Sequence, residues 1–160
     1  MSENISISAE SKAEKYQELL PQIEALIAYE SDTIANLANI SAALKEVFGW
    51  LWVGFYRKQE NYLILGPFQG PLACTRIPMG KGVCGTSASD HKTIVVENVN
   101  EFEGHIACSS ASKSEIVIPI LKNDELVWIL DIDSDKFNDF DNTDKKYLES
   151  LSNIIAKQLP

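Results

Sequence analysis

The amino-acid sequence predicts a single α+β domain, residues 1–160, built on a mainly antiparallel sheet of five or six strands. Apolar residues recur at helical spacing near both ends of the chain, and between these ends the period changes to two in short runs. Most of the runs are joined by turns too short for a parallel crossover. At 160 residues and 45% hydrophobic, the chain has enough apolar side chains for one core.

Helices are expected as a pair over about residues 9–47 and as a single helix over about 142–159. Pro21 predicts a kink or break in the first helix. Asp32 is the expected N-cap of the second helix, which Gly49 ends.

The sheet and the active-site core are expected over about residues 50–134. Residues 66–71 are rich in glycine and proline and predict an exposed loop, and residues 80–85 predict a tight turn that leads into a short helix. The expected strands fall at 50–56, 62–65, near 76–77, 93–96, 115–121 and 126–133.

The charge of the chain argues against nucleic acid and membrane surfaces as partners. The formal net charge is −9 and the pI is about 4.7, and no Lys/Arg cluster offsets this charge locally. The amino end lacks the basic and apolar regions of a secretory signal, and no apolar run approaches the roughly 20 residues that span a bilayer. We therefore expect a cytoplasmic protein.

Three carboxylates lie on two strands that are expected to be neighbours. Alternation over 126–133 places Asp131 and Asp133 on one strand face, and Glu115 begins the preceding strand. Like charges on an apolar strand indicate a cation site or a carboxyl group with a raised pKa, whereas a solvent-facing strand end explains them equally well. If the register brings the three acids to one end, they form a pocket suited to an ammonium group and to proton donation.

Aromatic residues mark the first expected strand. Trp50, Trp52 and Tyr56 share a face by alternation, and Gly54 leaves space between the last two. Such a face can accept an apolar ligand tail, although an aromatic stripe at this period is more often core.

The chain has three cysteines, an odd number without a CxxC pair, which does not make a disulfide framework. Cys84 lies in the glycine-rich turn before a helix, where backbone N–H groups favour thiolate. Cys74 follows the breaker-rich loop, and Cys108 lies in a polar segment with His105 as a candidate thiolate partner or proton shuttle. A single free cysteine is usually buried and inert, but three in exposed-looking loops favour reactive thiols.

We expect no metal and no bound cofactor. The glycines at 80, 82 and 85 lack the Lys-Ser/Thr of a P-loop and the spacing of a dinucleotide fingerprint. His91, His105 and the thiols do not match the ligand spacings of a closed zinc site.

Seven ordered motifs between residues 50 and 134 are similar to those of the GAF-domain free methionine-(R)-sulfoxide reductases. They are Trp52-Val53-Gly54-Phe55-Tyr56, Leu65-Gly66-Pro67-Phe68-Gln69-Gly70-Pro71, Ala73-Cys74-Thr75-Arg76-Ile77-Pro78, Gly80-Lys81-Gly82-Val83-Cys84-Gly85, Gly104-His105-Ile106-Ala107-Cys108, Ser114-Glu115-Ile116-Val117 and Leu130-Asp131-Ile132-Asp133-Ser134. The resemblance implies a GAF-like domain with the terminal helices packed on one face of the sheet.

The resemblance also implies a role for each candidate residue. Cys108 would be the attacking thiolate, Cys74 the main resolving thiol, and Cys84 an alternative or second one. Substrate contacts would come from three carboxylates and two aromatic residues, namely Glu115, Asp131, Asp133, Trp52 and Tyr56. This sequence departs from the family at Trp128, where a glycine is usual, and at Ser109, where an acid is common. By alternation Trp128 faces away from Asp131 and affects core packing rather than catalysis.

The activity implied is reduction of free methionine sulfoxide through a sulfenic acid and an intramolecular disulfide, which an external dithiol such as thioredoxin reduces. The family also suggests a homodimer. The rival interpretation is a non-catalytic GAF-type module that senses a small ligand or an oxidant, but such modules are usually fused to an output domain and do not need three thiols.

Overall fold

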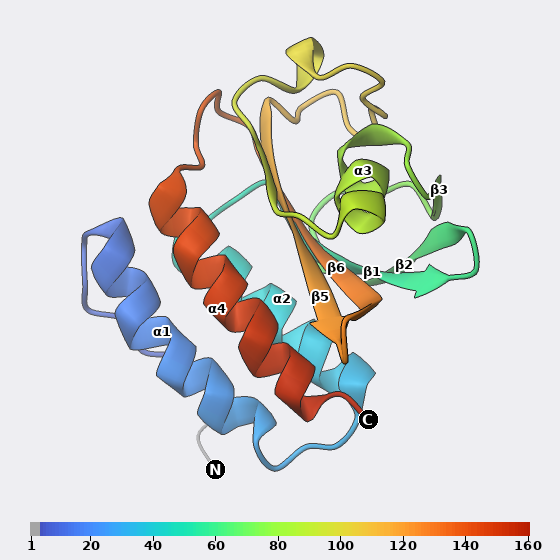
Figure 1. Cartoon of the computed structure of the whole chain (residues 1–160). Coiled ribbons are helices and arrows are strands. Elements are labelled where there is room, and N and C mark those ends of the chain that lie inside the picture. The colour runs from blue at the N-terminus through green and yellow to red at the C-terminus, as the bar shows by residue number, and fades with distance from the viewer. Residues whose placement is uncertain (1–3) are drawn as a thin grey trace.

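A computed structural model describes residues 4–160 (Figure 1). The helices are α1 (Lys12–Ile27), α2 (Thr33–Phe48), α3 (Gly82–Asp90) and α4 (Asn142–Gln158), with a 3₁₀ turn, η1, at Val99–Glu101. The strands are β1 (Trp52–Gln59), β2 (Tyr62–Gln69), β3 (Arg76–Pro78), β4 (Ile94–Val96), β5 (Ser114–Lys122) and β6 (Glu125–Ser134).

The strands form one sheet in the order β3-β2-β1-β6-β5-β4, and every neighbouring pair is antiparallel. This arrangement confirms the α+β class and the antiparallel six-stranded sheet. Helices α2 and α4 pack on one face of the sheet, and α1 lies outside them (Figure 1). The shorter α3 covers the opposite face.

Each face of the sheet carries its own apolar cluster, because alternate residues of a strand point to opposite sides. Ile116, Ile118 and Leu130 lie in the helix-side cluster with α1, α2 and α4. Val117 and Ile129 lie in the opposite cluster, beneath α3. The functional site must therefore be sought on the α3 side, where the sheet is covered by one short helix and by loops.

The helix ends follow their sequence signals, with one exception. Asp32 accepts a hydrogen bond from Ala35 N as the N-cap of α2, and Gly49 ends that helix with a φ of 69°. Pro21, however, lies inside α1 without ending it. The break predicted at Pro21 was therefore wrong. The exposed proline removes one hydrogen bond of the helix, while Leu19, Leu20 and Ile23 keep the helix packed.

The loop expected at residues 66–71 was wrong in its first part, because β2 continues to Gln69. Phe68 pairs with Gly54 and Gln69 with Val53, while the register between β1 and β2 shifts next to Gly66 and Pro67. A bulge leaves an extra residue unpaired, which allows a proline within a paired strand. Breaker residues therefore mark a bulge here rather than a strand end.

Two tryptophans lie on the helix side of the sheet. Trp50 precedes β1 and packs with Phe48 and Phe140, so the prediction that it shares a face with Trp52 was wrong. Strand alternation does not extend to Trp50, because the chain bends at Leu51, just before β1 begins. Trp128 packs over Gly66, where an added Cβ would lie 2.7 Å from the indole ring, and its expected orientation away from Asp131 is confirmed.

Candidate active site

One pocket on the α3 side gathers most of the residues that the sequence marked. It lies between the end of the β1-β6-β5 strands, α3 and the loop that precedes β5. Seven of the eight predicted site residues line it, namely Trp52, Tyr56, Cys84, Cys108, Glu115, Asp131 and Asp133. The eighth, Cys74, is bonded to Cys108 at the pocket wall.

Strand register brings the three acids together. Glu115 of β5 lies opposite Asp133 of β6, and Asp131 lies two residues further along the same face. On the other side of β6, Asp131 pairs with Gly54 and Asp133 with Trp52. The acids therefore project from two adjacent strands into one space, beside the aromatic face of β1.

Burial favours the protonated forms of Glu115 and Asp131. Glu115 is 5% exposed and Asp131 is 6% exposed. Burial raises the pKa of Glu115 well above its usual 4.5, and the charges of Asp131 and Asp133 on either side raise it further. Burial likewise raises the pKa of Asp131 well above its usual 3.8, and the charge of Asp133 raises it further. The neighbouring charges of both aspartates therefore add to the effect of burial in favouring the protonated form of Glu115.

The two aspartates differ in their partners. Ser112 Oγ donates to Asp133 Oδ1 at 2.8 Å, which opposes the effect of burial on the pKa of Asp133. Among the described residues, Asp131 Oδ1 is buried with no hydrogen-bond partner. An unpaired buried carboxylate oxygen is costly unless a ligand supplies the missing donor. The pocket therefore offers an open acceptor for a cationic or donor group.

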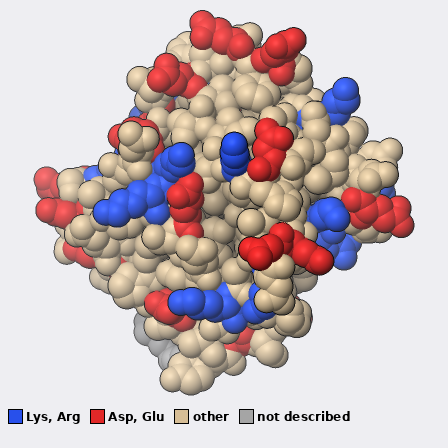
Figure 2. All heavy atoms as spheres, in the orientation of Figure 1, with Lys and Arg blue, Asp and Glu red and all other residues tan. Residues whose placement is uncertain are grey.

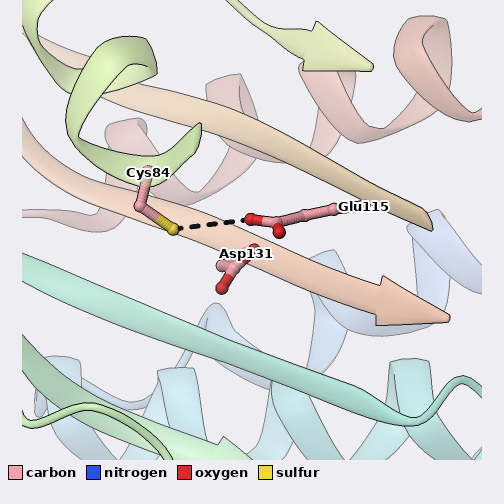
Figure 3. A group of neighbouring side chains, drawn as sticks. All are labelled: Cys84, Glu115 and Asp131. Carbon is pink, nitrogen blue, oxygen red and sulfur yellow. Dashed lines mark hydrogen bonds between the residues drawn. The ribbon is translucent and has the colours of Figure 1, made fainter. Parts of the chain in front are cut away.

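Cys84 points from α3 toward the acids (Figure 3). Its thiol lies 3.8 Å from Glu115 Oε1 and donates to it, and the side chain is 3% exposed. Burial, with the charges of Asp131 and Glu115, raises the pKa of Cys84 well above its usual 9.0. The expectation that the glycine-rich turn favours a Cys84 thiolate was therefore wrong, because surrounding acids and exclusion of water outweigh the backbone N–H groups.

The other two cysteines form a disulfide. Cys74 and Cys108 are 34 residues apart in sequence, and their Cα atoms lie 5.4 Å apart. Both lie on irregular loops, one between β2 and β3 and the other before β5. The bond joins the two thiols to which the family resemblance assigns attack and resolution.

The aromatic residues of β1 hold the loop that carries Cys74. Tyr56 Oη donates to the Cys74 carbonyl at 2.9 Å, and Trp52 Nε1 donates to the Pro71 carbonyl at 3.1 Å. Trp52 also stacks against Phe68, with ring centroids 5.3 Å apart. Burial and the charge of Asp131 raise the pKa of the Tyr56 phenol, so it remains a donor. These residues therefore form a pocket wall and also fix a cysteine.

His105 lies against the acids rather than beside a free thiol. Its Nε2 is 3.9 Å from Glu115 Oε2, and burial lowers its pKa below the usual 6.5. The lowered pKa of His105 and the raised pKa of Glu115 each favour the neutral form of that group.

Sequence reasoning did not identify Ser112, which bonds Asp133, because a serine in a polar segment carries no distinguishing pattern.

The GAF domain family model matches residues 32–158. This chain belongs to the GAF domain family. GAF domain-containing protein A of Dictyostelium discoideum is 55% identical to it, over 97% of this chain and 99% of that protein. The free methionine-R-sulfoxide reductase of Escherichia coli is 43% identical, over 93% of this chain and 91% of its own.

A solved structure gives the same likeness in three dimensions. The X-ray structure of free methionine-R-sulfoxide reductase from Neisseria meningitidis, in complex with its substrate, superposes on this GAF domain with a TM-score of 0.97. The two chains are 50% identical, and the match covers 98% of this chain and 95% of the other. The chain is thus similar over almost its whole length to GAF domains named as reductases.

The buried acids predict an unusual dependence of stability on pH. Since the folded-state pKa of Asp131 is raised, the folded protein holds this proton to higher pH than the unfolded chain does, and stability falls as pH rises above about 4. Asp131→Asn removes this loss. Its free energy of unfolding should exceed that of the wild-type GAF domain by a margin that grows with pH, to about 1 kcal/mol or more at pH 8.

Urea denaturation at pH 5, 6.5 and 8 measures this margin. Asp135→Asn is the matched control, because Asp135 is exposed just beyond the end of β6 and should show no such trend. A margin that stays constant or shrinks as pH rises would contradict the assignment of a raised pKa to Asp131.

Proposed function

We propose that this chain reduces free methionine-R-sulfoxide to methionine by thiol chemistry in the pocket described above. One observation carries the proposal: the Cys74–Cys108 disulfide forms part of the wall of a pocket lined by three carboxyl groups, of which Glu115 and Asp131 are buried. A non-catalytic ligand sensor needs neither the paired thiols nor the protonated acids. The reductases named above, which match almost the full length of the chain, support the choice of substrate.

The acids provide a site for the ammonium group of a free amino acid. Asp131 Oδ1 lacks a partner among the described residues, and an ammonium group supplies the missing donor together with a compensating charge. Asp133 lines the same pocket and is partly exposed, and its Oδ1 accepts a hydrogen bond from Ser112. We assign the α-ammonium to these two aspartates, and the methyl-sulfinyl end to Trp52 and Tyr56.

The first chemical step begins with reduced Cys108. Its thiolate attacks the sulfoxide sulfur, and the sulfoxide oxygen needs a proton as the sulfur–oxygen bond weakens. We assign this proton to Glu115, because burial and both aspartates raise its pKa. The protonated oxygen passes from the sulfoxide sulfur to the Cys108 sulfur, so the sulfoxide is reduced to methionine, which is released, and Cys108 is oxidised to a sulfenic acid.

The second step converts the Cys108 sulfenic acid to a disulfide, which protects the cysteine from further oxidation. The Cys74 thiol condenses with the Cys108 sulfenic acid, which forms the disulfide and releases water. Cys84, buried beside Glu115, remains the candidate for a second resolving thiol. Two thiols are oxidised for each sulfoxide that is reduced.

An external dithiol must then reduce the disulfide, and we propose thioredoxin in this role and no bound cofactor. Such a cycle requires a reducing compartment, and we therefore propose a cytoplasmic location.

No helix in the described part of the chain is both long and apolar enough to cross a membrane. On the face seen in Figure 2, acidic and basic side chains are interspersed. The homodimer stays a prediction.

The assignment of Cys108 predicts a complete and specific loss of activity in Cys108→Ser. Wild type, given racemic free methionine sulfoxide and dithiothreitol or thioredoxin, should consume half of the substrate and release an equal amount of methionine. The serine variant should be slower by about 10³-fold or more, because a hydroxyl is a poor nucleophile without a base beside it. No turnover by folded, reduced wild type would favour the ligand sensor.

The ammonium site predicts selection for the free amino acid. A methionine sulfoxide inside a peptide has an uncharged amide in place of the ammonium group, and losing one partner of a buried charge pair costs about 2 kcal/mol or more. We therefore expect kcat/KM for a peptide-embedded sulfoxide at least about 30-fold below that for the free substrate. Comparable values for the two substrates would exclude the proposed use of Asp131 and Asp133.

A further inference from the structure

We propose that the reduced protein also binds one thiophilic divalent cation, of which Zn²⁺ is the example, through Cys84, Glu115 and Asp131. The sequence predicts no metal site, because the three residues are 31 and 16 positions apart and match no ligand spacing. The fold nevertheless places a thiol and two carboxylates, from α3, β5 and β6, around one point (Figure 3).

The distances fit a single ion. One ligand atom from each residue lies within 4.8 Å of the other two. The Cys84 Sγ to Glu115 Oε1 distance is 3.8 Å, and zinc bonds of about 2.3 Å to sulfur and 2.0 Å to oxygen separate two tetrahedral ligands by about 3.5 Å. The Cys84–Glu115 pair therefore lies within about 0.3 Å of the separation that tetrahedral zinc requires.

Burial supplies an independent reason for a ligand at this point. Asp131 is 6% exposed, and its Oδ1 is the buried side-chain oxygen for which the described residues offer no partner. A cation bound to this oxygen removes the cost of an unsatisfied acceptor. Asp133 does not share this need, since its Oδ1 already accepts from Ser112.

The donor set selects the class of metal. Mg²⁺ and Ca²⁺ need about six or more oxygen ligands, whereas one sulfur and two oxygens suit Zn²⁺ or Cd²⁺. Three protein ligands leave a fourth position for water, or for His105, whose Nε2 lies 3.9 Å from the other Glu115 oxygen. With three protein ligands, the site is similar to the open zinc sites of enzymes, whereas closed structural zinc sites have four.

The zinc site is inferred from side-chain geometry and burial alone. Its consequence for activity rests on the proposed function: the ion binds Asp131, to which we also assign the substrate ammonium group, so it should act as a competitive inhibitor. The binding experiment below uses no substrate. Failure to bind zinc would leave the reductase proposal standing, and failure of the reductase assay would leave the zinc site standing.

Calorimetric titration of the full-length Cys74→Ser/Cys108→Ser variant with Zn²⁺ tests the inference, because Cys84 is then the only thiol in the chain. The protein is first treated with a chelator and a phosphine reductant. We expect saturation at one ion per chain, and with Cd²⁺ the ultraviolet absorption of a metal–thiolate bond.

Two further substitutions in this background locate the site. Cys84→Ser and Asp131→Asn keep the side-chain size, and each should weaken zinc binding by about tenfold or more. Cys84→Ser should also abolish the Cd²⁺–thiolate absorption. Asp135→Asn, an exposed carboxylate beyond β6, should leave binding unchanged. Absence of saturable binding, or binding unaffected by both substitutions in chains whose circular dichroism matches the parent, would overturn the proposal.

Discussion

The pairing of β5 with β6 is the constraint on which the site depends. It sets Glu115 opposite Asp133 and keeps Asp131 on the same face, while Ile116 and Ile132 point to the helices. A slip of β5 by one residue against β6 would send Glu115 into the helix-side core and Ile116 into the pocket. The free-energy cost of that exchange is large, because a carboxyl group would be buried among apolar side chains and an isoleucine would leave its core. Packing on one face therefore fixes the chemistry of the other.

The two faces of the sheet differ in function: one packs against α2 and α4, and the other carries the pocket. The helix side is closed by α1, α2 and α4 around the larger of the two apolar clusters. On the α3 side, Asp131 has a buried oxygen without a partner among the described residues. The raised pKa of this acid also lowers the stability of the fold as pH rises. Two loops close this side, and Tyr56 and Trp52 donate to backbone carbonyls of the one that carries Cys74. A stable scaffold thus holds a site that is costly when empty.

Much of the fold follows from local signals, since Asp32, Gly49 and the alternation over residues 126–133 act within a few positions. The motif resemblance also indicated which residues would gather in the pocket, although alternation alone left the strand register open. What local patterns missed depends on distant partners. The strand at residues 66–69 exists because β1 pairs with it across a bulge, and Trp50 leaves the strand face because the chain turns before β1. The high pKa of Cys84 comes from burial and from acids 31 and 47 residues away, neither of which a local pattern contains.

The central claim is that the Cys74–Cys108 bond is the product of sulfoxide reduction above the acid pocket. A single-turnover experiment tests it most directly: fully reduced protein receives excess free methionine sulfoxide without any reductant, and methionine release and disulfide connectivity by mass spectrometry are measured together. The account predicts one methionine per chain, a new bond between Cys74 and Cys108, and Cys84 still free. Methionine release with a bond to Cys84 instead, or formation of the Cys74–Cys108 bond without methionine release, would contradict it.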